Sequence, residues 1–524
     1  MAQITVSNLT FAYPGAHDDI FKNVSFSIDT KWKLGFIGRN GRGKTTMMRL
    51  FMGQYEYSGS IISPVEFSYF PMDDSEAKNF SSAKQYLKSV IGPYVQLEGD
   101  MERALESGDN DLYSELLMKY LELDGYEIDA RLETECAKLN VDPDALERPY
   151  NTLSNGERTK TLLAALFLRP NNFLLIDEPT NHLDTAGRAV VRDYLSGKEG
   201  YILISHDRAL LDAVCDHVLS INRSTIDVQA GNYSTWAENK RMRDEYDIER
   251  NEHLKGEIKR LTETAREKAA WSDKIEASKI GNHVADRGAV GARAAKMMQK
   301  SKNAQRRVEK NIEEKESLMK DLELVGALKL PATEYVKPRL MDLFDVSINY
   351  GQGALFSPRS FSVMRGDRIA LTGPNGCGKS SLLKLILGEN IPHTGKISMS
   401  GGIKISYLPQ ESDKLQGPVR EFAQREGVDE TLFLTLLRKL EFPRVQFEKD
   451  LSQLSLGQRR KALLAITLAT AADLYIWDEP LNYIDVISRT QIEEALLYSK
   501  PTMIFVEHDD VFVNNVATKI IKLQ

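Results

Sequence analysis

The fold is decided by Gly38-Arg-Asn-Gly-Arg-Gly-Lys44-Thr45 and by Gly373-Pro-Asn-Gly-Cys-Gly-Lys379-Ser380. Both stretches read G-x-x-x-x-G-K-[ST], the pattern of a loop that binds the phosphates of a nucleotide. Each follows a short apolar strand and precedes a helix with apolar periodicity, as that loop requires. The glycines let backbone N–H groups turn toward phosphate oxygens, and the helix N-terminus adds partial positive charge. The sequence therefore predicts two nucleotide-binding units in one chain.

Four further segments recur in the same order after each loop. They are Leu153-Ser-Asn-Gly-Glu157 with Leu454-Ser-Leu-Gly-Gln458, Phe173-Leu-Leu-Ile-Asp177-Glu178-Pro with Leu474-Tyr-Ile-Trp-Asp478-Glu479-Pro, Asn181-His-Leu-Asp184 with Asn482-Tyr-Ile-Asp485, and Ile204-Ser-His206-Asp with Val506-Glu-His508-Asp. A repeat of this length indicates two copies of one α/β fold.

The two copies differ by an insertion in the first. The loop lysine and the next serine of the L-S-x-G pattern are 110 positions apart in the first copy (Lys44 to Ser154) and 76 apart in the second (Lys379 to Ser455). The first copy therefore carries about 34 extra residues, which we expect as a helical elaboration within about residues 81–141.

The loops predict the residues that contact the nucleotide. They are Gly38, Asn40, Gly41, Gly43, Lys44, Thr45 and Thr46 in the first copy, and Gly373, Asn375, Gly376, Gly378, Lys379, Ser380 and Ser381 in the second. Lys44 and Lys379 are expected to reach the β- and γ-phosphates, and the hydroxyls of Thr45 and Ser380 to hold Mg²⁺.

Residues after the apolar strands predict the hydrolytic groups. Asp177 and Asp478 end their strands and are expected to bind the metal. Glu178 and Glu479 follow at once, placed to orient or deprotonate the attacking water.

Two further pairs of residues take their predicted roles from their repeated positions. His206 and His508 follow the next apolar strand and are expected to sense the γ-phosphate. Tyr13 and Tyr350 precede the loops by 25 and 23 positions and suit adenine stacking, although an aromatic residue there also fits a core position.

Composition excludes several classes of protein. The chain has 524 residues, net charge −7 and three cysteines, values that exclude a disordered chain and a disulfide scaffold. The longest uncharged apolar stretch, residues 462–472, is shorter than a membrane span, and the N-terminus lacks the pattern of a signal peptide. We expect a cytoplasmic protein that has no membrane segment.

The set of motifs resembles the ATP-binding cassette family. Two cassettes in one chain, a long charged linker and the segment Gly231-Asn-Tyr-Ser-Thr-Trp236 look like its ABC-F subfamily. The resemblance implies an ATPase in which the cassettes of one monomer close head-to-tail around two ATP molecules. Each L-S-x-G-[EQ] signature then completes the opposite site. Those signature residues are Ser154, Gly156 and Glu157, and Ser455, Gly457 and Gln458.

One departure from the family pattern predicts unequal sites. The glutamine that the family places after the outer strand, which also reaches the metal, is present as Gln410 in Tyr407-Leu-Pro-Gln410, whereas the first copy reads Tyr69-Phe-Pro-Met72. A thioether is a poor ligand for Mg²⁺. We therefore expect the Lys379 site to hydrolyse ATP faster than the Lys44 site.

The linker predicts a second functional part. Residues 239–278 and 294–324 read as two helices of a hairpin around the glycine-containing segment 280–291. Between Arg287 and Lys310 eight basic residues face one acidic residue, a net charge of about +7 that suits RNA. We divide the chain into a first cassette (1–237), the linker (238–325) and a second cassette (326–524).

The resemblance also implies the partners. The linker of the subfamily enters the ribosome at the tRNA exit site, so large-subunit rRNA and tRNA are expected partners. The inserted arm is similar to one that touches the ribosomal stalk protein. The long linker and the Ala294-Ala-Lys-Met-Met298 run look like the Vga/Lsa-type antibiotic-resistance group, which implies protection against lincosamides, pleuromutilins and streptogramin A. The residues expected at the tip are His283, Val284, Arg287, Val290, Arg293 and Lys296.

Other readings stay open at this point. A housekeeping ABC-F translation factor has the same motifs. An ATPase subunit of a membrane transporter would need a membrane partner and has no use for the hairpin. A DNA-maintenance ATPase would carry a much longer coiled coil or zinc-binding inserts, and no C-x-x-C occurs here. A non-catalytic scaffold is disfavoured by Glu178 and Glu479.

Overall fold

The computed structural model describes residues 2–15, 19–181, 183–222, 225–277, 306–307, 310, 328, 330–331, 337–351, 353–374, 376–411 and 415–524. The chain forms two compact units. The first unit combines Met1–Ser234 with Gly326–Gln524 and contains both cassettes, and the second is Thr235–Val325.

The first cassette is built on a six-stranded sheet of order β5-β6-β7-β3-β8-β9, in which β8 and β9 are the antiparallel pair. Its strands are β3 (Lys33–Ile37), β5 (Glu66–Phe70), β6 (Asn172–Asp177), β7 (Tyr201–Ile204), β8 (His217–Ile221) and β9 (Ile226–Ala230). A separate antiparallel sheet of order β2-β1-β4 consists of β1 (Gln3–Phe11), β2 (Phe21–Asp29) and β4 (Ser58–Ile62).

The second cassette repeats this plan with a parallel sheet of order β14-β15-β16-β12-β17. Its strands are β12 (Arg368–Thr372), β14 (Ile405–Leu408), β15 (Leu474–Asp478), β16 (Met503–Val506) and β17 (Lys519–Lys522). The antiparallel sheet β11-β10-β13 consists of β10 (Arg339–Ile348), β11 (Arg359–Met364) and β13 (His393–Met399). The predicted repeat of one α/β fold is confirmed.

Burial on both faces explains why the central strands read as continuous apolar runs. All five residues of β15 are buried, as are all four of β16. The helices that pair with these sheets are α1 (Lys44–Phe51), α7 (Asn155–Leu168), α8 (Thr185–Ser196) and α9 (Arg208–Val214) in the first cassette, and α12 (Lys379–Ile386), α15 (Leu456–Ala469), α16 (Val486–Ser499) and α17 (Asp510–Val516) in the second.

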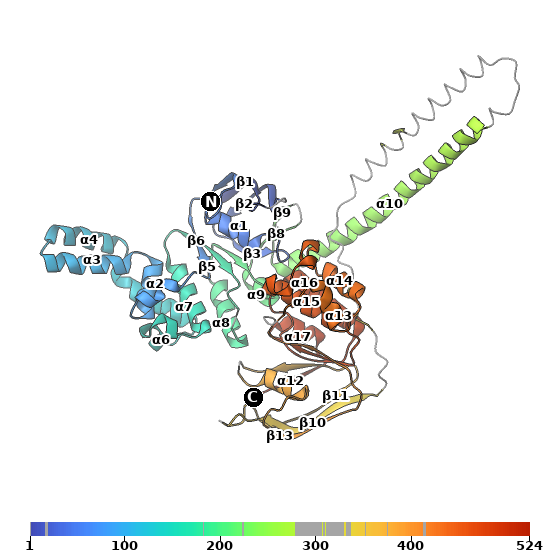
Figure 1. Ribbon diagram of the computed structural model, residues 1–524. Coiled ribbons are helices and arrows are strands. Elements are labelled where there is room, and N and C mark those ends of the chain that lie inside the picture. The colour runs from blue at the N-terminus through green and yellow to red at the C-terminus, as the bar shows by residue number, and fades with distance from the viewer. Residues whose placement is uncertain are drawn as a thin grey trace, which may run out of the picture. The chain divides into compact units, whose positions relative to one another are not determined.

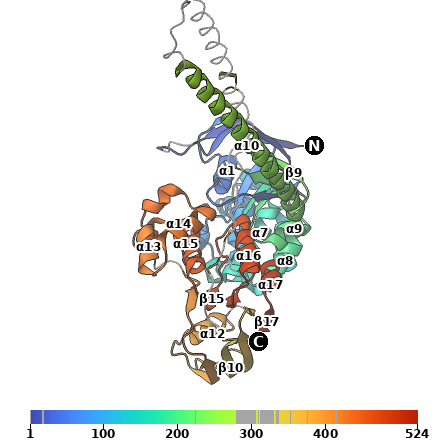
Figure 2. The same ribbon diagram turned by 90° about the vertical axis from the view of Figure 1, so that its right-hand side faces the viewer.

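The region expected to contain the insertion, residues 81–141, is largely helical. The first cassette has α2 (Ala83–Ile91), α3 (Tyr94–Ser107), α4 (Asn110–Glu122), α5 (Ile128–Lys138) and α6 (Pro143–Glu147), and the second has α13 (Val419–Arg425) and α14 (Glu430–Lys439). Helices α2 and α5 both pack on α7, and α14 packs on α15. Figure 1 shows α2 beside α7, and Figure 2 shows α14 beside α15. The additional part is the pair α3 and α4, which pack against each other.

Short 3₁₀ turns lie between β5 and α2 and between several of the helices. They are η1 (Ser75–Asn79), η2 (Gly125–Glu127), η3 (Tyr150–Thr152), η5 (Arg444–Glu448) and η6 (Leu451–Gln453).

The linker begins with one long helix, α10 (Tyr233–Ala277), drawn as a continuous ribbon in Figure 1. It starts six residues before the predicted Asn239. Of the predicted returning helix 294–324, only Arg306, Arg307 and Lys310 are described, and they are helical and exposed. The six predicted tip residues, 283, 284, 287, 290, 293 and 296, lie outside the described residues. Among the helices that are described, none combines the length and apolar character needed to cross a membrane.

Candidate nucleotide-binding sites

The last glycine of each phosphate loop has a backbone conformation that other residues adopt only with strain. Gly43 has φ 95° and Gly378 has φ 93°, a left-handed conformation that side chains disfavour. A Cβ atom on Gly43 would also lie 2.7 Å from Ile20 Cγ2. The loops can therefore turn sharply into α1 and α12, whose N-termini face the site where phosphates would bind.

The loop lysines lie inside their own loops. Lys44 Nζ donates hydrogen bonds to the carbonyl oxygens of Gly38 (2.5 Å) and Arg39 (3.2 Å). Lys379 Nζ donates to Gly373 O (2.8 Å) and Pro374 O (2.9 Å). Each ammonium group is thus held where it can reach a phosphate. Burial lowers the pKa of Lys44, while the carboxylates of Asp485, Glu178 and Asp177 act in the opposite direction.

The predicted metal ligands lie next to each other in both sites. Thr45 Oγ1 donates a hydrogen bond to Asp177 Oδ2 at 3.1 Å, and Ser380 lies close enough to Asp478 to act on the pKa of its carboxyl group. Burial raises the pKa of both aspartates. Among the described residues, no donor reaches the buried Oδ1 of Asp478. A hydroxyl and a carboxylate with an unsatisfied oxygen suit a hard cation such as Mg²⁺, so the donor set fits the predicted metal.

Glu178 occupies a strained and poorly solvated position. Its φ is 52°, and its N–H donates to Ile204 O at 2.9 Å, which holds it at the end of β6. Its buried Oε1 accepts no hydrogen bond from the described residues, although His206 Nε2 lies 3.4 Å away. Burial, with a contribution from Asp177, raises the pKa of Glu178 to about 8. Burial also lowers the pKa of His206 well below its usual value.

Glu479 has the same backbone but different neighbours. Its φ is 48°, and its N–H donates to Val506 O at 2.9 Å. Asn482 Nδ2 donates to its Oε2 at 2.5 Å, and His508 Nε2 lies 3.6 Å from its Oε1. Burial acts to raise the pKa of Glu479, but the polar groups of His508, Gln410 and Asn482 outweigh it and lower the pKa to about 2. Met72, the counterpart of Gln410, is 40% exposed and offers no amide.

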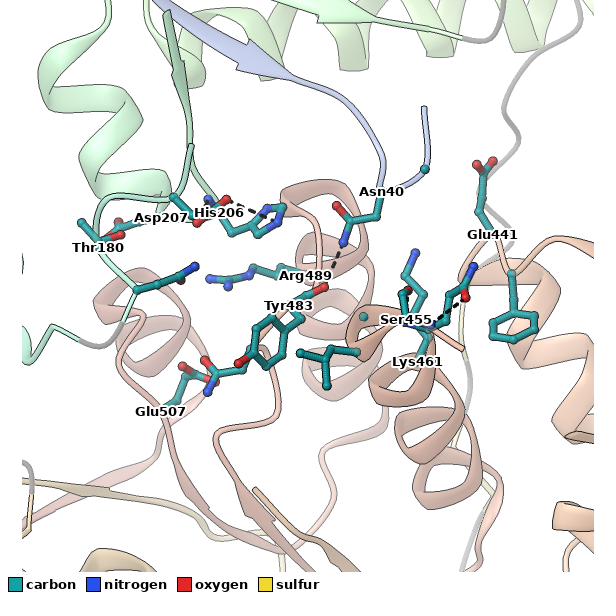
Figure 3. Close-up of a pocket in the computed structure, with 18 of the residues that line it drawn as sticks. Asn40, Thr180, His206, Asp207, Glu441, Ser455, Lys461, Tyr483, Arg489 and Glu507 are labelled. Carbon is teal, nitrogen blue, oxygen red and sulfur yellow. Dashed lines mark hydrogen bonds and ion pairs between the residues drawn. The ribbon is translucent and has the colours of Figure 1, made fainter. Parts of the chain in front are cut away.

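The first cavity brings together groups from both cassettes. It has a volume of about 420 Å³. Figure 3 shows Asn40 and His206 of the first cassette on one side and Ser455 and Tyr483 of the second on the other. Asn40 Nδ2 donates to Tyr483 O at 2.9 Å, and the Asn40 N–H donates to Asp485 Oδ2 at 3.4 Å. Of the predicted residues, Asn40, Gly41, Glu178, His206, Ser455, Gly457 and Gln458 line this cavity.

The second cavity is about 840 Å³, twice as large. Of the predicted residues, Tyr350, Gly376, Gly378, Lys379, Ser380, Ser381, Gln410, Glu479 and His508 line it. The first cassette contributes Asn181, Leu183 and Arg188, whereas its predicted signature residues Ser154, Gly156 and Glu157 are not among the described residues around this cavity. The structure therefore brings one signature to the opposite phosphate loop and leaves the other apart from it.

Both signatures also begin a helix with the same cap. Ser154 and Glu157 form a capping box at α7, and Ser455 and Gln458 form one at α15. This local role follows from the S-x-x-[EQ] spacing itself, which the sequence already shows.

The two predicted adenine-stacking tyrosines lie near their loops. The hydroxyls of Tyr13 and Thr46 are hydrogen-bonded at 2.9 Å, and the Tyr13 ring packs edge-on against Tyr55 with centroids 5.6 Å apart. Tyr350 is exposed and lines the second cavity. Stacking on adenine stays a prediction for both. Asn375, predicted in the second loop, lies outside the described residues.

The motifs did not single out several residues that the structure places in these sites. Tyr69 donates its hydroxyl to Asp177 Oδ2 at 2.9 Å, and Lys461 Nζ lies 3.0 Å from the buried Oδ2 of Asp485. Arg460 contacts the ends of two strands of the second sheet. A comparison of the two copies residue by residue could have pointed to Arg460, because the first copy has Thr159 at that position.

This fold and these sites define a P-loop protein with two ATP-binding domains in one chain, one of whose sites is completed by the opposite domain. The model of the ABC transporter family matches residues 21–181 and 356–482, more than half of the chain. The chain belongs to that family and is an ATPase of the ATP-binding cassette class.

Curated relatives match over nearly the whole chain. The putative ATP-binding protein YdiF of Bacillus subtilis is 28% identical, covering 97% of this chain and 78% of its own length. The energy-dependent translational throttle protein EttA of Escherichia coli K12 is 26% identical, covering 96% of this chain and 89% of its own. ABC transporter F family member 2 of Arabidopsis thaliana is 26% identical, covering 99% and 76%.

Solved structures share the fold. An archaeal ribosome recycling factor, aABCE1, in complex with the ribosomal stalk protein aP1, has a TM-score of 0.60 at 18% identity and covers 98% of this chain and 87% of its own. A structure named RNase-L Inhibitor has a TM-score of 0.58 at 19% identity, covering 98% and 87%. At such identities the likeness shows the fold alone.

Proposed function

We propose that this chain is an ABC-F protein that binds the ribosome in an ATP-dependent manner and acts at the tRNA exit site. The observation that carries the proposal is the combination of two cassettes with the 45-residue helix α10 between them. At 1.5 Å per residue that helix spans about 67 Å, a length suited to reaching into a large particle. The name of EttA, a translational throttle protein, supports the same direction.

ATP would control binding by closing the cassettes. Lys44 and Lys379 would hold the phosphates, and Mg²⁺, which would neutralise phosphate charge, would be held by Thr45, Asp177, Ser380, Asp478 and Gln410. Glu178 and Glu479 would orient the attacking water. Hydrolysis of ATP to ADP and phosphate would then allow the closed cassettes to reopen. ATP can drive ribosome binding only if the closed state has the higher affinity for the ribosome.

The finer part of the proposal is protection from antibiotics that bind the peptidyl-transferase centre. The hairpin would pass the exit-site tRNA, and its tip (residues 280–291) would promote drug release, with rRNA and tRNA as the contacted molecules. The net charge of about +7 between Arg287 and Lys310 favours phosphate contacts. The α3–α4 pair would contact the ribosomal stalk protein. The drugs implied are lincosamides, pleuromutilins and streptogramin A.

A translational throttle is the second candidate function. EttA aligns over 96% of this chain, which favours a role in translation without any drug. The two candidates share the cassettes and differ in what the linker does at the ribosome.

One expression experiment separates them. The wild-type chain and the Glu178→Gln/Glu479→Gln variant are expressed in a drug-sensitive bacterium, and growth is measured against lincomycin, tiamulin and virginiamycin M. Protection should raise the inhibitory concentration of at least one drug at least fourfold with the wild type and not with the variant. No change for any drug, together with slowed protein synthesis in drug-free extracts, would support the throttle instead.

Ribosome binding is tested separately with the same variant. With ATP, it should co-sediment with ribosomes, because closure occurs and reopening does not. With ADP the amount bound should fall severalfold. Failure of the variant to co-sediment in ATP would contradict both candidate functions.

A further inference from the structure

The second cassette contains a buried arginine that joins two parts of its ATP site. Arg460 lies on α15, five residues after the signature serine, and its side chain is 1% exposed. Its guanidinium donates hydrogen bonds to five backbone carbonyls, of Pro409, Gln410 (3.3 Å), Asp478 (2.7 Å), Glu479 and Pro480 (3.3 Å).

These five carbonyls belong to two segments far apart in the sequence. Pro409 and Gln410 follow β14, and the other three follow or end β15. Parallel pairing already aligns the two strands, and Arg460 ties their ends beyond the last ladder pair. A planar guanidinium offers five N–H groups in a fixed fork, so its geometry restricts both segments at once.

The first cassette lacks this connection. Aligned on the signature serines, the counterpart of Arg460 is Thr159, whose short neutral side chain cannot span two segments. Aligned on the switch histidines His206 and His508, the counterpart of Ser205 is Glu507. The second copy thus has a positive and a negative residue where the first has two hydroxyl residues.

Glu507 compensates the buried charge of Arg460. Glu507 is buried, its Oε2 accepts from the Leu481 N–H at 3.1 Å, and its Oε1 accepts from the His508 N–H at 2.8 Å. Burial lowers the pKa of Arg460 to about 10, and Glu507, Asp478 and Glu479 act against that shift. An isolated buried charge would be costly, so removal of one of the two residues should destabilise the site more than removal of both.

We propose that Arg460 is a positioning residue for ATP hydrolysis at the Lys379 site, and that it acts by holding the Gln410 segment against Glu479. Gln410 and Glu479 line the same cavity, and Arg460 fixes the backbone of both residues. Within the described part of the chain, the hydrogen bonds of Arg460 go to neither phosphate loop. This inference rests on the ATPase activity and is independent of the proposed role on the ribosome.

The test measures hydrolysis at one site. In a Glu178→Gln background, which leaves the Lys379 site as the hydrolysing site, Arg460→Thr places the first-cassette residue in the second. We expect kcat to fall about 30-fold, in the range that misplacement of a catalytic group by about 1 Å produces, while KM for ATP changes less than about threefold. Arg460→Lys keeps the charge but loses the planar fork, and should recover only part of kcat.

A double variant guards against a folding defect. Arg460→Thr/Glu507→Ser removes both charges and recreates the pair that the first cassette carries, so the fold should tolerate it. The double variant should bind ATP like the parent and remain about 30-fold slow. If it hydrolyses at the parental rate, Arg460 only neutralises Glu507 and the proposal is wrong.

Thr159→Ala is the matched control at the counterpart position, and its kcat should stay within about twofold of the parent. A rise in KM for ATP with an unchanged kcat for Arg460→Thr would also overturn the proposal.

Discussion

The two catalytic glutamates share one backbone conformation and differ in their surroundings. Glu178 has φ 52° and Glu479 has φ 48°, values that are uncommon for residues other than glycine and often occur at functional sites. Glu479 accepts a hydrogen bond from Asn482 Nδ2 at 2.5 Å and lines the same cavity as Gln410, whereas Glu178 accepts one from the His206 N–H at 3.4 Å and its Oε1 accepts none from the described residues. Side chains therefore orient the Glu479 carboxylate more firmly than that of Glu178, whose site has Met72 in place of Gln410.

This difference predicts unequal hydrolysis at the two sites. Single-turnover hydrolysis by Glu178→Gln, which relies on Glu479, should be at least about tenfold faster than that by Glu479→Gln. The reason is that the Glu479 carboxylate is oriented by Asn482 and lies in the cavity with Gln410, so it is better placed to accept a proton from water. Rapid-quench measurement of ADP formed from bound ATP checks this.

The side chain of Met72 supplies a second check on the same difference. In the Glu479→Gln background, Met72→Gln should raise single-turnover hydrolysis about threefold to tenfold, because it restores an amide at the counterpart of Gln410. Met72→Leu is the control, since it keeps an apolar side chain, and it should leave the rate unchanged. Equal single-turnover rates for Glu178→Gln and Glu479→Gln, or no gain from Met72→Gln, would contradict the asymmetry.

At the scale of elements, helix α5 is tied to the region after α8 by one buried carboxylate. Glu135 accepts hydrogen bonds from Tyr194 (2.6 Å) and Lys138 (2.7 Å) and pairs with Lys198. Burial acts to raise the pKa of Glu135, but the two lysines and the tyrosine outweigh it and lower the pKa to about 2. Because α5 flanks the inserted α3–α4 pair, this contact anchors one end of the insertion.

The lowered pKa of Glu135 predicts how stability depends on pH. A carboxylate whose pKa falls from about 4.3 unfolded to about 2 folded stabilises the protein above pH about 4.3, and the contribution is lost as pH falls toward 2. Glu135→Gln should therefore lower the free energy of unfolding by about 2 kcal/mol at pH 7 and by about half as much at pH 3. Urea denaturation at both pH values measures it.

Glu133→Gln is the matched control on the same helix. Glu133 is exposed and pairs with Lys84 at 2.7 Å, and exposed pairs contribute about 0–1 kcal/mol. An effect of Glu133→Gln as large as that of Glu135→Gln, or a Glu135→Gln effect independent of pH, would show that burial and pairing of Glu135 are not the cause.

The sequence predicts those elements whose chemistry is local. The phosphate loops, the strand-ending aspartates and the signature helices follow from short motifs, because each motif needs a particular backbone turn or cap. Contacts such as Asn40 Nδ2 to Tyr483 O join positions 443 apart and depend on how the cassettes meet. The place of the roughly 34 inserted residues within 81–141 carries no motif, and the structure points to the pair α3 and α4, which pack on each other. Arg460 carries no motif, so its role needed its five carbonyl partners.

At the scale of the unit formed by both cassettes, pairing relies on a buried ion pair between them. Arg208, at the start of α9, has its Nη2 2.7 Å from Glu493 Oε2 on α16, with both side chains less than a tenth exposed. The counterparts in the repeat are Asp510 and Arg192, with the charges exchanged. The first cassette thus has a positive residue at both positions, and the second has a negative residue at both. This arrangement favours pairing of each cassette with the other over pairing with a copy of itself.

Removal of Arg208 should weaken closure of the cassettes. Arg208→Met leaves Glu493 buried without its cation, so the closed state becomes less populated and the ATP concentration for half-maximal ATPase should rise at least about tenfold. Arg208→Met/Glu493→Gln removes both charges and should recover most of that loss. Arg192→Met is the control, because Arg192 is 41% exposed and lies 3.4 Å from its neighbour Asp193, an arrangement worth little. An equal effect of Arg192→Met would mean that turnover uses a closed state in which Arg192 meets Asp510, so the second cavity would close as tightly as the first. No effect of Arg208→Met would mean that this ion pair does not contribute to pairing of the cassettes.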